Sequence, residues 1–195
     1  MKGIMELPQG YQPLMKVDLA GNKRLFVLVN AGALVIGAGM TLLGLLFTPL
    51  SALFDKGFGL QLLLRSAALL LGMVAYIVLH ELVHGVFIRL FSGKRAKYGF
   101  GLSYAWAGSD AYFEKIPYLV IALAPVVFWG AVLAVLCAVV PPGWFWVVYF
   151  IQVLNISGAV GDFYVTVRFL TLPRDILVQD SGTAMTVFAK TQETQ

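Results

Sequence analysis

Four long apolar segments constrain the fold of this chain more than any other feature of its sequence. They run from about Leu25 to Leu50, Leu62 to Phe91, Ile116 to Val140 and Trp144 to Leu170. Each is long enough to form a helix across the hydrocarbon core of a bilayer, which takes about 20 residues. With 59% hydrophobic and only 12% charged residues, the chain has too few polar side chains to cover such helices in water. We therefore expect an all-α integral membrane protein with four transmembrane helices, forming a single domain over residues 1–195.

Positive charge is concentrated in the N-terminal arm, in the central loop between the second and third segments, and in the C-terminal tail. These basic residues are Lys2, Lys16, Lys23, Arg24, Lys94, Arg95, Lys97, Lys115, Arg168, Arg174 and Lys190. The other two loops contain only Lys56. Because cytoplasmic loops are enriched in lysine and arginine, we expect a multi-pass protein of the cell membrane with both termini in the cytoplasm. Arg65 and Arg89, near the ends of the second segment, are expected to extend toward the membrane surface.

The polar segments on the cytoplasmic side carry strand signals. In the central loop, residues 92–115, aromatic residues alternate with glycine and other small residues, which favours short strands. In the tail, residues 175–190, two short apolar runs flank Asp180-Ser181-Gly182, which predicts a hairpin. We expect a small strand-rich cytoplasmic element, and the edge of the central loop can pair with an extended substrate segment as an added strand. The basic residues form no stripe with interleaved aromatics, so nucleic acid is not an expected partner.

The second apolar segment contains the motif HELVHG, residues 80–85. On a helix, positions i and i+4 lie on one face, so His80 and His84 can both reach one metal ion. Glu81 is offset by one residue and lies beside the metal, where it can take a proton from a metal-bound water. Ionisable side chains at membrane depth cost about 2.5–3.5 kcal/mol each, so three within five residues require a compensating partner. The motif therefore predicts a Zn²⁺ site inside the membrane.

A catalytic zinc ion needs a third protein ligand, with the fourth position left to water. An extended HExxHxxGxxH motif is absent, because Phe87 and Leu90 occupy the positions of its glycine and third histidine. Asp162 is the acidic residue within the fourth segment. It lies about 12 Å from the cytoplasmic end of that helix at 1.5 Å per residue, and the HELVHG motif lies at a similar depth of about 13 Å. We expect Asp162 to be the third ligand.

Polar and small residues follow a helical spacing along the fourth segment: Gln152, Asn155, Ala159, Asp162 and Thr166. Gly158 and Gly161 flank this stripe and allow another helix to approach closely. The stripe has two interpretations, a ligand-bearing face or a polar seam that joins helices. Asn155, two turns before Asp162, is a candidate for binding substrate or a tetrahedral oxyanion, with interhelical hydrogen bonding as the alternative.

These motifs resemble a known family. HELVHG, then AYFEKIPYLVIALAP, NISGAVGDFYV and a tail with a DSG turn are similar to small bacterial and archaeal membrane proteins catalogued as zincin-type peptidases. The chain also resembles, more distantly, the site-2 protease clan of intramembrane metalloproteases. The resemblance implies His80, His84 and Asp162 as zinc ligands, Glu81 as general base and Asn155 as a substrate-binding residue. The chain departs from the site-2 pattern at Gly158 and Gly161, in a stretch where that clan carries prolines.

We therefore expect an intramembrane zinc metalloprotease that cleaves peptide bonds of membrane-associated proteins or peptides by a glutamate-activated, zinc-bound water. Two alternatives remain open. A non-catalytic zinc-binding membrane adaptor would have no need of Glu81. A small transporter would need a polar pathway through several helices, whereas the first and third segments are nearly free of polar groups.

Overall fold

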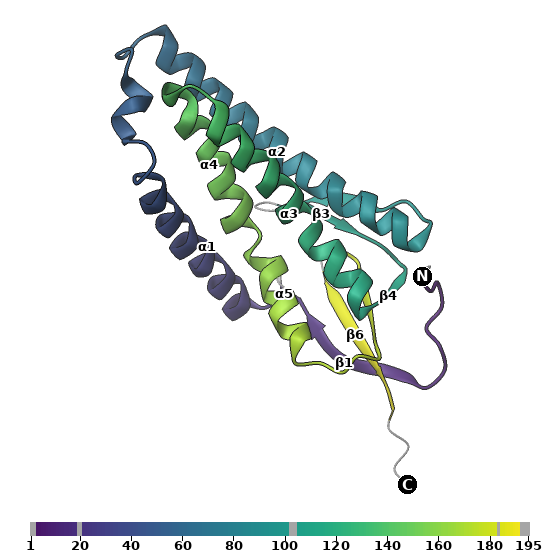
Figure 1. Ribbon diagram of the computed structural model, residues 1–195. Coiled ribbons are helices and arrows are strands. Elements are labelled where there is room, and N and C mark those ends of the chain that lie inside the picture. Colours follow the sequence, from purple (N-terminus) through teal and green to yellow (C-terminus); the bar gives the residue numbers. More distant parts are fainter. Residues whose placement is uncertain (1–2, 19–20, 102–104, 183, 192–195) are drawn as a thin grey trace. The chain divides into compact units, whose positions relative to one another are not determined.

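Three helices and one pair of successive helices correspond to the four apolar segments. The computed structural model describes residues 3–18, 21–101, 105–182 and 184–191 (Figure 1). The helices in these ranges are α1 (Lys23–Gly44), α2 (Leu60–Ser92), α3 (Lys115–Val139), α4 (Pro142–Gly158) and α5 (Val160–Leu170). The first three, and α4 with α5 together, are each long and apolar enough to cross a membrane. The predicted set of four apolar helical segments is confirmed, and three residues of the central loop, 102–104, lie outside the described residues.

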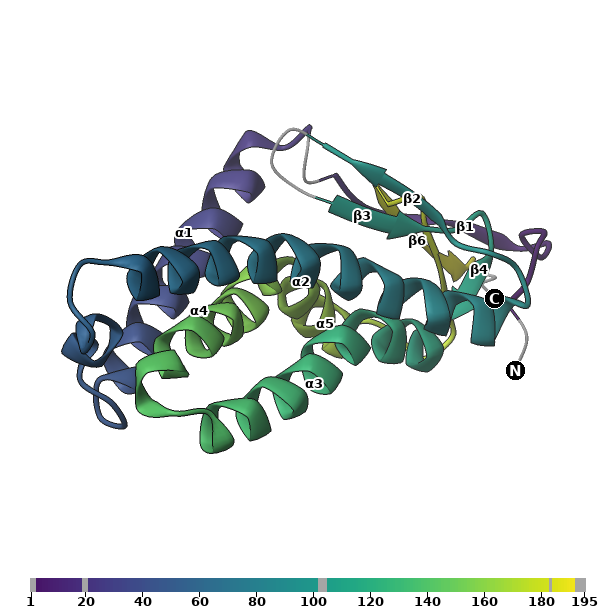
Figure 2. The ribbon, with the colours of Figure 1, turned by 90° about the horizontal axis from the view of Figure 1, so that it is seen from above.

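Two of the predicted segments end or divide earlier than expected. The first helix stops at Gly44, and Leu50–Phe54 form a separate short 3₁₀ helix, η1, behind Pro49. Proline lacks an N–H and disfavours helical geometry in the residue before it, so the chain turns here. The fourth segment is divided at Ala159 into α4 and α5, which Figure 2 shows as successive helices. Gly158 and Gly161 flank this point and lower its helix propensity.

The chain forms two compact units, and the first contains every strand found in the described residues. This unit comprises Met1–Val27, Glu81–Ala124 and Asp162–Gln195. Its main sheet is antiparallel with the strand order β1 (Tyr11–Val17), β6 (Met185–Lys190), β5 (Ile176–Asp180) and β4 (Tyr112–Glu114). A second sheet pairs β2 (Lys97–Phe100) with β3 (Ala105–Gly108). The hairpin predicted at Asp180-Ser181-Gly182 is confirmed, since β5 and β6 pair on either side of it and Gly182 has a φ of 87°.

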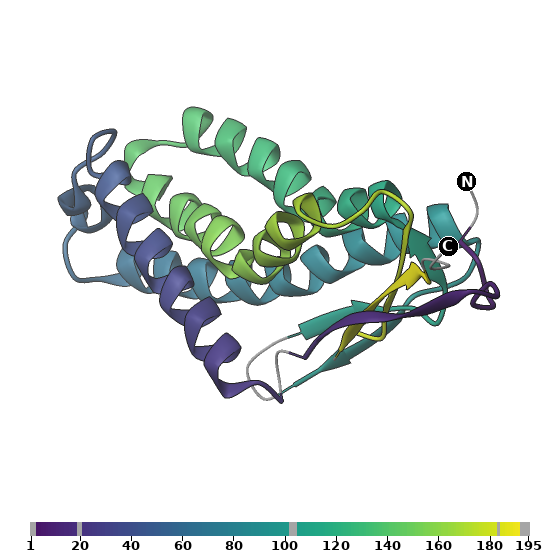
Figure 3. The same cartoon turned by 90° about the horizontal axis from the view of Figure 1, so that it is seen from below.

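Strand β1 is the one that the sequence did not predict. It contains Pro13, and its register with β6 shifts between Pro13 and Met15. Figure 3 shows β1 as the purple strand beside the yellow β6. Because β1 is an edge strand, the missing N–H of proline and the bulge cost few hydrogen bonds. The strand-rich element therefore includes the N-terminal arm as well as the loop and the tail. Its core consists of side chains that are almost fully buried: Phe113, Phe169, Ile176, Val178 and Val187.

The second unit, Leu28–His80 and Pro125–Gly161, is helical. Phe145, Trp146 and Tyr149 of α4 form its buried aromatic cluster. The Trp146 ring nitrogen donates to the carbonyl of Pro49 at 3.1 Å, and the Tyr149 hydroxyl donates to the carbonyl of Met40 at 2.7 Å. These bonds satisfy the polar ends of two large aromatic side chains that are otherwise packed in an apolar environment.

Arg65 is buried in this unit, so the prediction that it extends toward the membrane surface is wrong. Its side chain is 4% exposed and does not extend to a surface. Its guanidinium donates to the carboxylate of Asp55 at 2.7 Å and to the carbonyl of Leu53 at 2.7 Å. Gly143, at the start of α4, packs so closely against the guanidinium that a Cβ would overlap it. Arg65 therefore fastens the α1–α2 connection to the helix that carries it.

Candidate metal centre

The HELVHG motif lies within α2, which runs without a break from Leu60 to Ser92 (Figure 1). The boundary of the two units falls at the peptide bond between His80 and Glu81, inside this helix. The helix alone therefore determines how His80 is placed relative to His84. Residues i and i+4 are neighbours on one helix face. Both imidazoles consequently project from the same side of α2, one turn apart.

Asp162 supplies a carboxylate next to these imidazoles. It lies in the first turn of α5, and its Oδ1 is 3.9 Å from Nε2 of His84. The side chains of His84 and Asp162 are 12% and 25% exposed, so water reaches this place only in part. One ligand atom from each of His80, His84 and Asp162 lies within 4.8 Å of the others. Two imidazole nitrogens and one carboxylate oxygen are the donor types of a catalytic zinc site.

The other ring nitrogen of each histidine has a partner within the protein. Nδ1 of His84 is 2.9 Å from the carbonyl oxygen of Ile121 in α3. Nδ1 of His80 is 2.7 Å from the hydroxyl of Tyr76, one turn earlier in α2. A histidine that binds a metal usually forms a hydrogen bond through its second ring nitrogen, and this bond orients the ring toward the metal.

Glu81 faces strand β3. The backbone N–H of Ala107 lies near its carboxylate, and Asp162 and Asp180 act on that carboxylate electrostatically. The neighbouring strand β2 also contacts α2, because Tyr98 packs over Gly85 so closely that a Cβ at that position would overlap the Tyr98 hydroxyl. Only glycine permits this approach without displacement. The strands thus hold a backbone donor beside the carboxylate that the sequence marks as the general base.

A further acid, Asp180, lies at the end of β5. Its carboxylate accepts hydrogen bonds from the Tyr118 hydroxyl and from the N–H of Gly182, the latter at 2.8 Å. Burial raises the pKa of Asp180 above its usual range, and these two donors act in the opposite direction. The DSG sequence suggested only a turn. Its contact with Tyr118, 62 residues away, could not be inferred from local spacing.

Asn155 is fully buried in α4. Its Nδ2 donates to the carbonyl of Val126 at 3.2 Å and to Oε1 of Gln152 at 3.3 Å. Its Oδ1 accepts a hydrogen bond of 2.8 Å from the Tyr76 hydroxyl. The helix break at Ala159 separates Asn155 from Asp162. The substrate-binding role of Asn155 stays a prediction.

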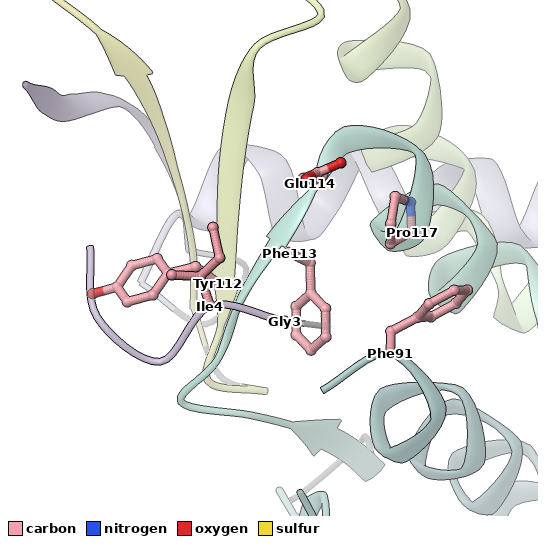
Figure 4. A pocket seen from close by; sticks show the side chains of 7 residues that line it. All are labelled: Gly3, Ile4, Phe91, Tyr112, Phe113, Glu114 and Pro117. Carbon is pink, nitrogen blue, oxygen red and sulfur yellow. The ribbon is translucent and has the colours of Figure 1, made fainter. Parts of the chain in front are cut away.

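Tyr76 was missed in the sequence, although one signal for it was present. It stands four residues before His80, which places it on the same face of α2. A tyrosine in an apolar helix is more often read as packing than as a hydrogen-bond partner. A small pocket elsewhere, lined by Gly3, Ile4, Phe91, Tyr112, Phe113, Glu114 and Pro117, contains none of the predicted site residues (Figure 4).

A helix that carries HExxH, with a carboxylate from a later helix beside its histidines, is typical of zinc-dependent peptidases. The comparison with protein families agrees with this class. The chain matches, over residues 73–177, the model of a family described as "Putative zincin peptidase", and it belongs to that family. The match spans Tyr76, the HELVHG motif and Asp162, and it ends before Asp180. The zincin class implies zinc as the cofactor.

One curated relative is similar over part of its length. A stretch of 123 residues is 30% identical to an "Uncharacterized 24.7 kDa protein in gap 5'region" of Pyrococcus woesei, covering 60% of this chain and 53% of the relative. The chain therefore spans about half the length of that protein. No solved structure matches the chain significantly.

Proposed function

We propose that this protein is an intramembrane zinc metallopeptidase that hydrolyses peptide bonds of membrane-associated proteins or peptides. The observation that carries the proposal is the approach of the Asp162 carboxylate to His84, at 3.9 Å, on the face of α2 that also bears His80. A divalent cation between these three groups would offset the cost of placing them in apolar helices. The distant sequence resemblance to the site-2 protease clan, in which such a site lies within the membrane, supports the same proposal.

The donor set fits zinc. Ligand atoms at about 2.0–2.2 Å from zinc in a tetrahedral arrangement lie roughly 3.4 Å from one another. The three donor atoms already lie within 4.8 Å of one another. Side-chain rotations that move these atoms by about 1–2 Å would therefore bring them to the spacing of zinc ligands. His80, His84 and Asp162 would hold the ion, and three protein ligands of these types are the set found in catalytic rather than structural zinc sites.

Zinc bound there supplies Lewis acidity, which polarises a carbonyl group and lowers the pKa of water toward about 7. Glu81 accepts the proton of the attacking water at its carboxylate and then transfers it to the nitrogen of the leaving amine. The N–H of Ala107 holds that carboxylate in place while it changes charge. Residues from α2 and β3 thereby divide the work of proton transfer and positioning.

The proposal places the reaction within the bilayer. Large apolar side chains cover the outside of α1, with Leu28 62%, Leu34 76% and Val35 72% exposed, and lipid is the environment in which such a surface is stable. We assign both termini and the strands to the cytoplasmic side of the cell membrane, following the distribution of lysine and arginine. The site then lies below that surface.

The substrate must be extended at the bond that is cleaved, because a helix withholds its peptide groups in internal hydrogen bonds. The edge of β3 that faces Glu81 is the candidate for pairing with such a segment. Replacing Ala105 with proline removes an N–H from this strand. We expect this variant to lose cleavage and keep zinc, and full activity would contradict the pairing.

Glu81→Gln is the variant that tests the function. It keeps the size of the side chain and removes the base, so it is expected to retain zinc and lose proteolysis. Quantitative proteomics of membrane fragments, with wild type against Glu81→Gln, then reports the substrates. Retained zinc with no difference in fragments would favour the adaptor function. Loss of zinc in the variant would contradict the assignment of Glu81 as the base.

A further inference from the structure

The hydrogen bonds behind the two histidines determine where each ring carries its proton. Asn155 is the starting point for His80. Its Nδ2 lies 3.2 Å from the backbone carbonyl of Val126, which can only accept a hydrogen bond. Turning the amide over would bring two oxygens together, so the orientation of Asn155 is fixed. Oδ1 of Asn155 therefore faces Tyr76 as an acceptor.

The hydrogen bond of Tyr76 to Asn155 determines which nitrogen of His80 carries the proton. Its hydroxyl has a single hydrogen, which it donates to Oδ1 of Asn155 at 2.8 Å. The hydroxyl oxygen is also 2.7 Å from Nδ1 of His80, and it can only accept at that contact. Nδ1 of His80 consequently carries the proton. In the neutral ring, the lone pair is then on Nε2, the nitrogen available to a metal ion.

The proton position of His84 is determined by a backbone carbonyl. In a helix, the N–H of residue i donates to the carbonyl of residue i−4. Pro125 lies inside α3 and has no N–H, so the carbonyl of Ile121 lacks its ordinary intrahelical donor. Nδ1 of His84 occupies that place, 2.9 Å from the Ile121 oxygen. A carbonyl can only accept, so the proton of this ring is on Nδ1 as well.

We propose that Tyr76, Asn155 and Pro125 are positioning residues that hold both histidines with Nε2 turned toward the metal. The inference rests on the proposed function and deepens it by naming the residues that build the metal site from behind. It also gives Asn155 a role in which both of its N–H donors are engaged within the protein. The proline in the middle of a membrane-type helix is explained by the carbonyl that it releases.

Zinc affinity of the purified full-length chain in detergent tests this proposal. Removing an outer hydrogen-bond partner of a metal ligand typically weakens binding by about 10–100-fold. We expect Tyr76→Phe to fall in this range. Pro125→Ala restores a competing N–H, but the Ile121 carbonyl has a second lone pair, so its effect is expected at the lower end, about tenfold. Competition with a chromophoric chelator measures both values.

Matched controls separate this effect from general damage. Tyr149→Phe removes a hydroxyl that donates to the carbonyl of Met40 and contacts no histidine. Pro117→Ala replaces a proline in the first turn of α3, where the N–H has no intrahelical acceptor in any case. Both controls are expected to bind zinc as the wild type does. The visible spectrum of the cobalt-substituted protein should change in Tyr76→Phe and Pro125→Ala and stay unchanged in the two controls.

A double-mutant cycle tests the relay itself. Asn155→Ala releases the Tyr76 hydrogen and is expected to weaken zinc binding in the wild-type background. In the Tyr76→Phe background the same change should add no further loss, because the two residues act in series. Wild-type affinity and an unchanged cobalt spectrum in Tyr76→Phe and Pro125→Ala would overturn the proposal and leave the proposed function intact. A wild-type chain without zinc affinity would overturn both.

Discussion

Gly85→Ala is the substitution whose consequence follows most directly from the packing around the site. A Cβ at this position would overlap the Tyr98 hydroxyl and lie 2.6 Å from the ring carbon that bears it. Overpacking of this kind costs about 1–3 kcal/mol. Because Tyr98 is 47% exposed, its ring can turn outward, so we expect the lower end of that range, about 1 kcal/mol.

The same displacement is expected to affect catalysis more than stability. Tyr98 stands opposite Ala107 in the β2–β3 pair, and the N–H of Ala107 lies beside the Glu81 carboxylate. Misplacing a catalytic group by about 1 Å can cost up to about a hundredfold in rate, so we expect a shift of these strands to lower kcat by roughly tenfold or more. Zinc affinity should not change, since neither histidine moves. Peptidase assays, zinc titration and thermal unfolding of Gly85→Ala measure the three quantities.

Gly39→Ala is the matched control, because a Cβ there meets no atom within 4 Å. It replaces a helical glycine in α1 and is expected to be neutral or to stabilise by up to about 1 kcal/mol. Combining Gly85→Ala with Tyr98→Ala removes the overlap and should recover the unfolding temperature of Tyr98→Ala alone. If Gly85→Ala unfolds and cleaves as the wild type does, the inferred coupling between β2, β3 and Glu81 is refuted.

Three further predictions concern residues away from the metal. Gly143→Ala pushes a Cβ into the Arg65 guanidinium and should lower the unfolding temperature by several degrees in a thermal melt. The pKa of Asp55 is lowered by its hydrogen bond to Arg65. The pair therefore stabilises the fold above about pH 4, and this stabilisation is lost as the pH falls below that value. Asp55→Asn should remove this pH dependence from acid unfolding curves. Gly182→Ala combines a φ of 87° with an overlap on the Trp106 ring, and we expect lower stability than in the Gly39→Ala control in the same melt.

The parts of the fold that depend on local sequence could be predicted. The apolar runs gave the helices, and the spacing of His80 and His84 gave a shared helix face. Pro49 lies near the end of the first predicted segment, and Gly158 lies where the fourth divides. A count of apolar residues does not detect either boundary. Strand β1 escaped prediction because its contacts are with β6, more than 160 residues later, and because proline, here Pro13, is uncommon within strands.

The surroundings of the site were less accessible to sequence reasoning. The contact of His84 with Ile121 joins two helices across 37 positions, and that of Tyr76 with Asn155 spans 79. No periodicity reports such a pairing, since it depends on how the helices pack. Pro125 was visible as a helix proline, but its released carbonyl acquires a meaning only when the imidazole beside it is known.

X-ray absorption spectroscopy at the zinc edge of the purified wild-type chain tests whether His80, His84 and Asp162 bind zinc together. We expect one zinc ion per chain, with two imidazole nitrogens and carboxylate or water oxygens at about 2.0–2.2 Å, and loss of that ion in Asp162→Ala. A chain that binds zinc through fewer than two imidazoles, or as tightly in Asp162→Ala as in the wild type, would contradict this three-residue site.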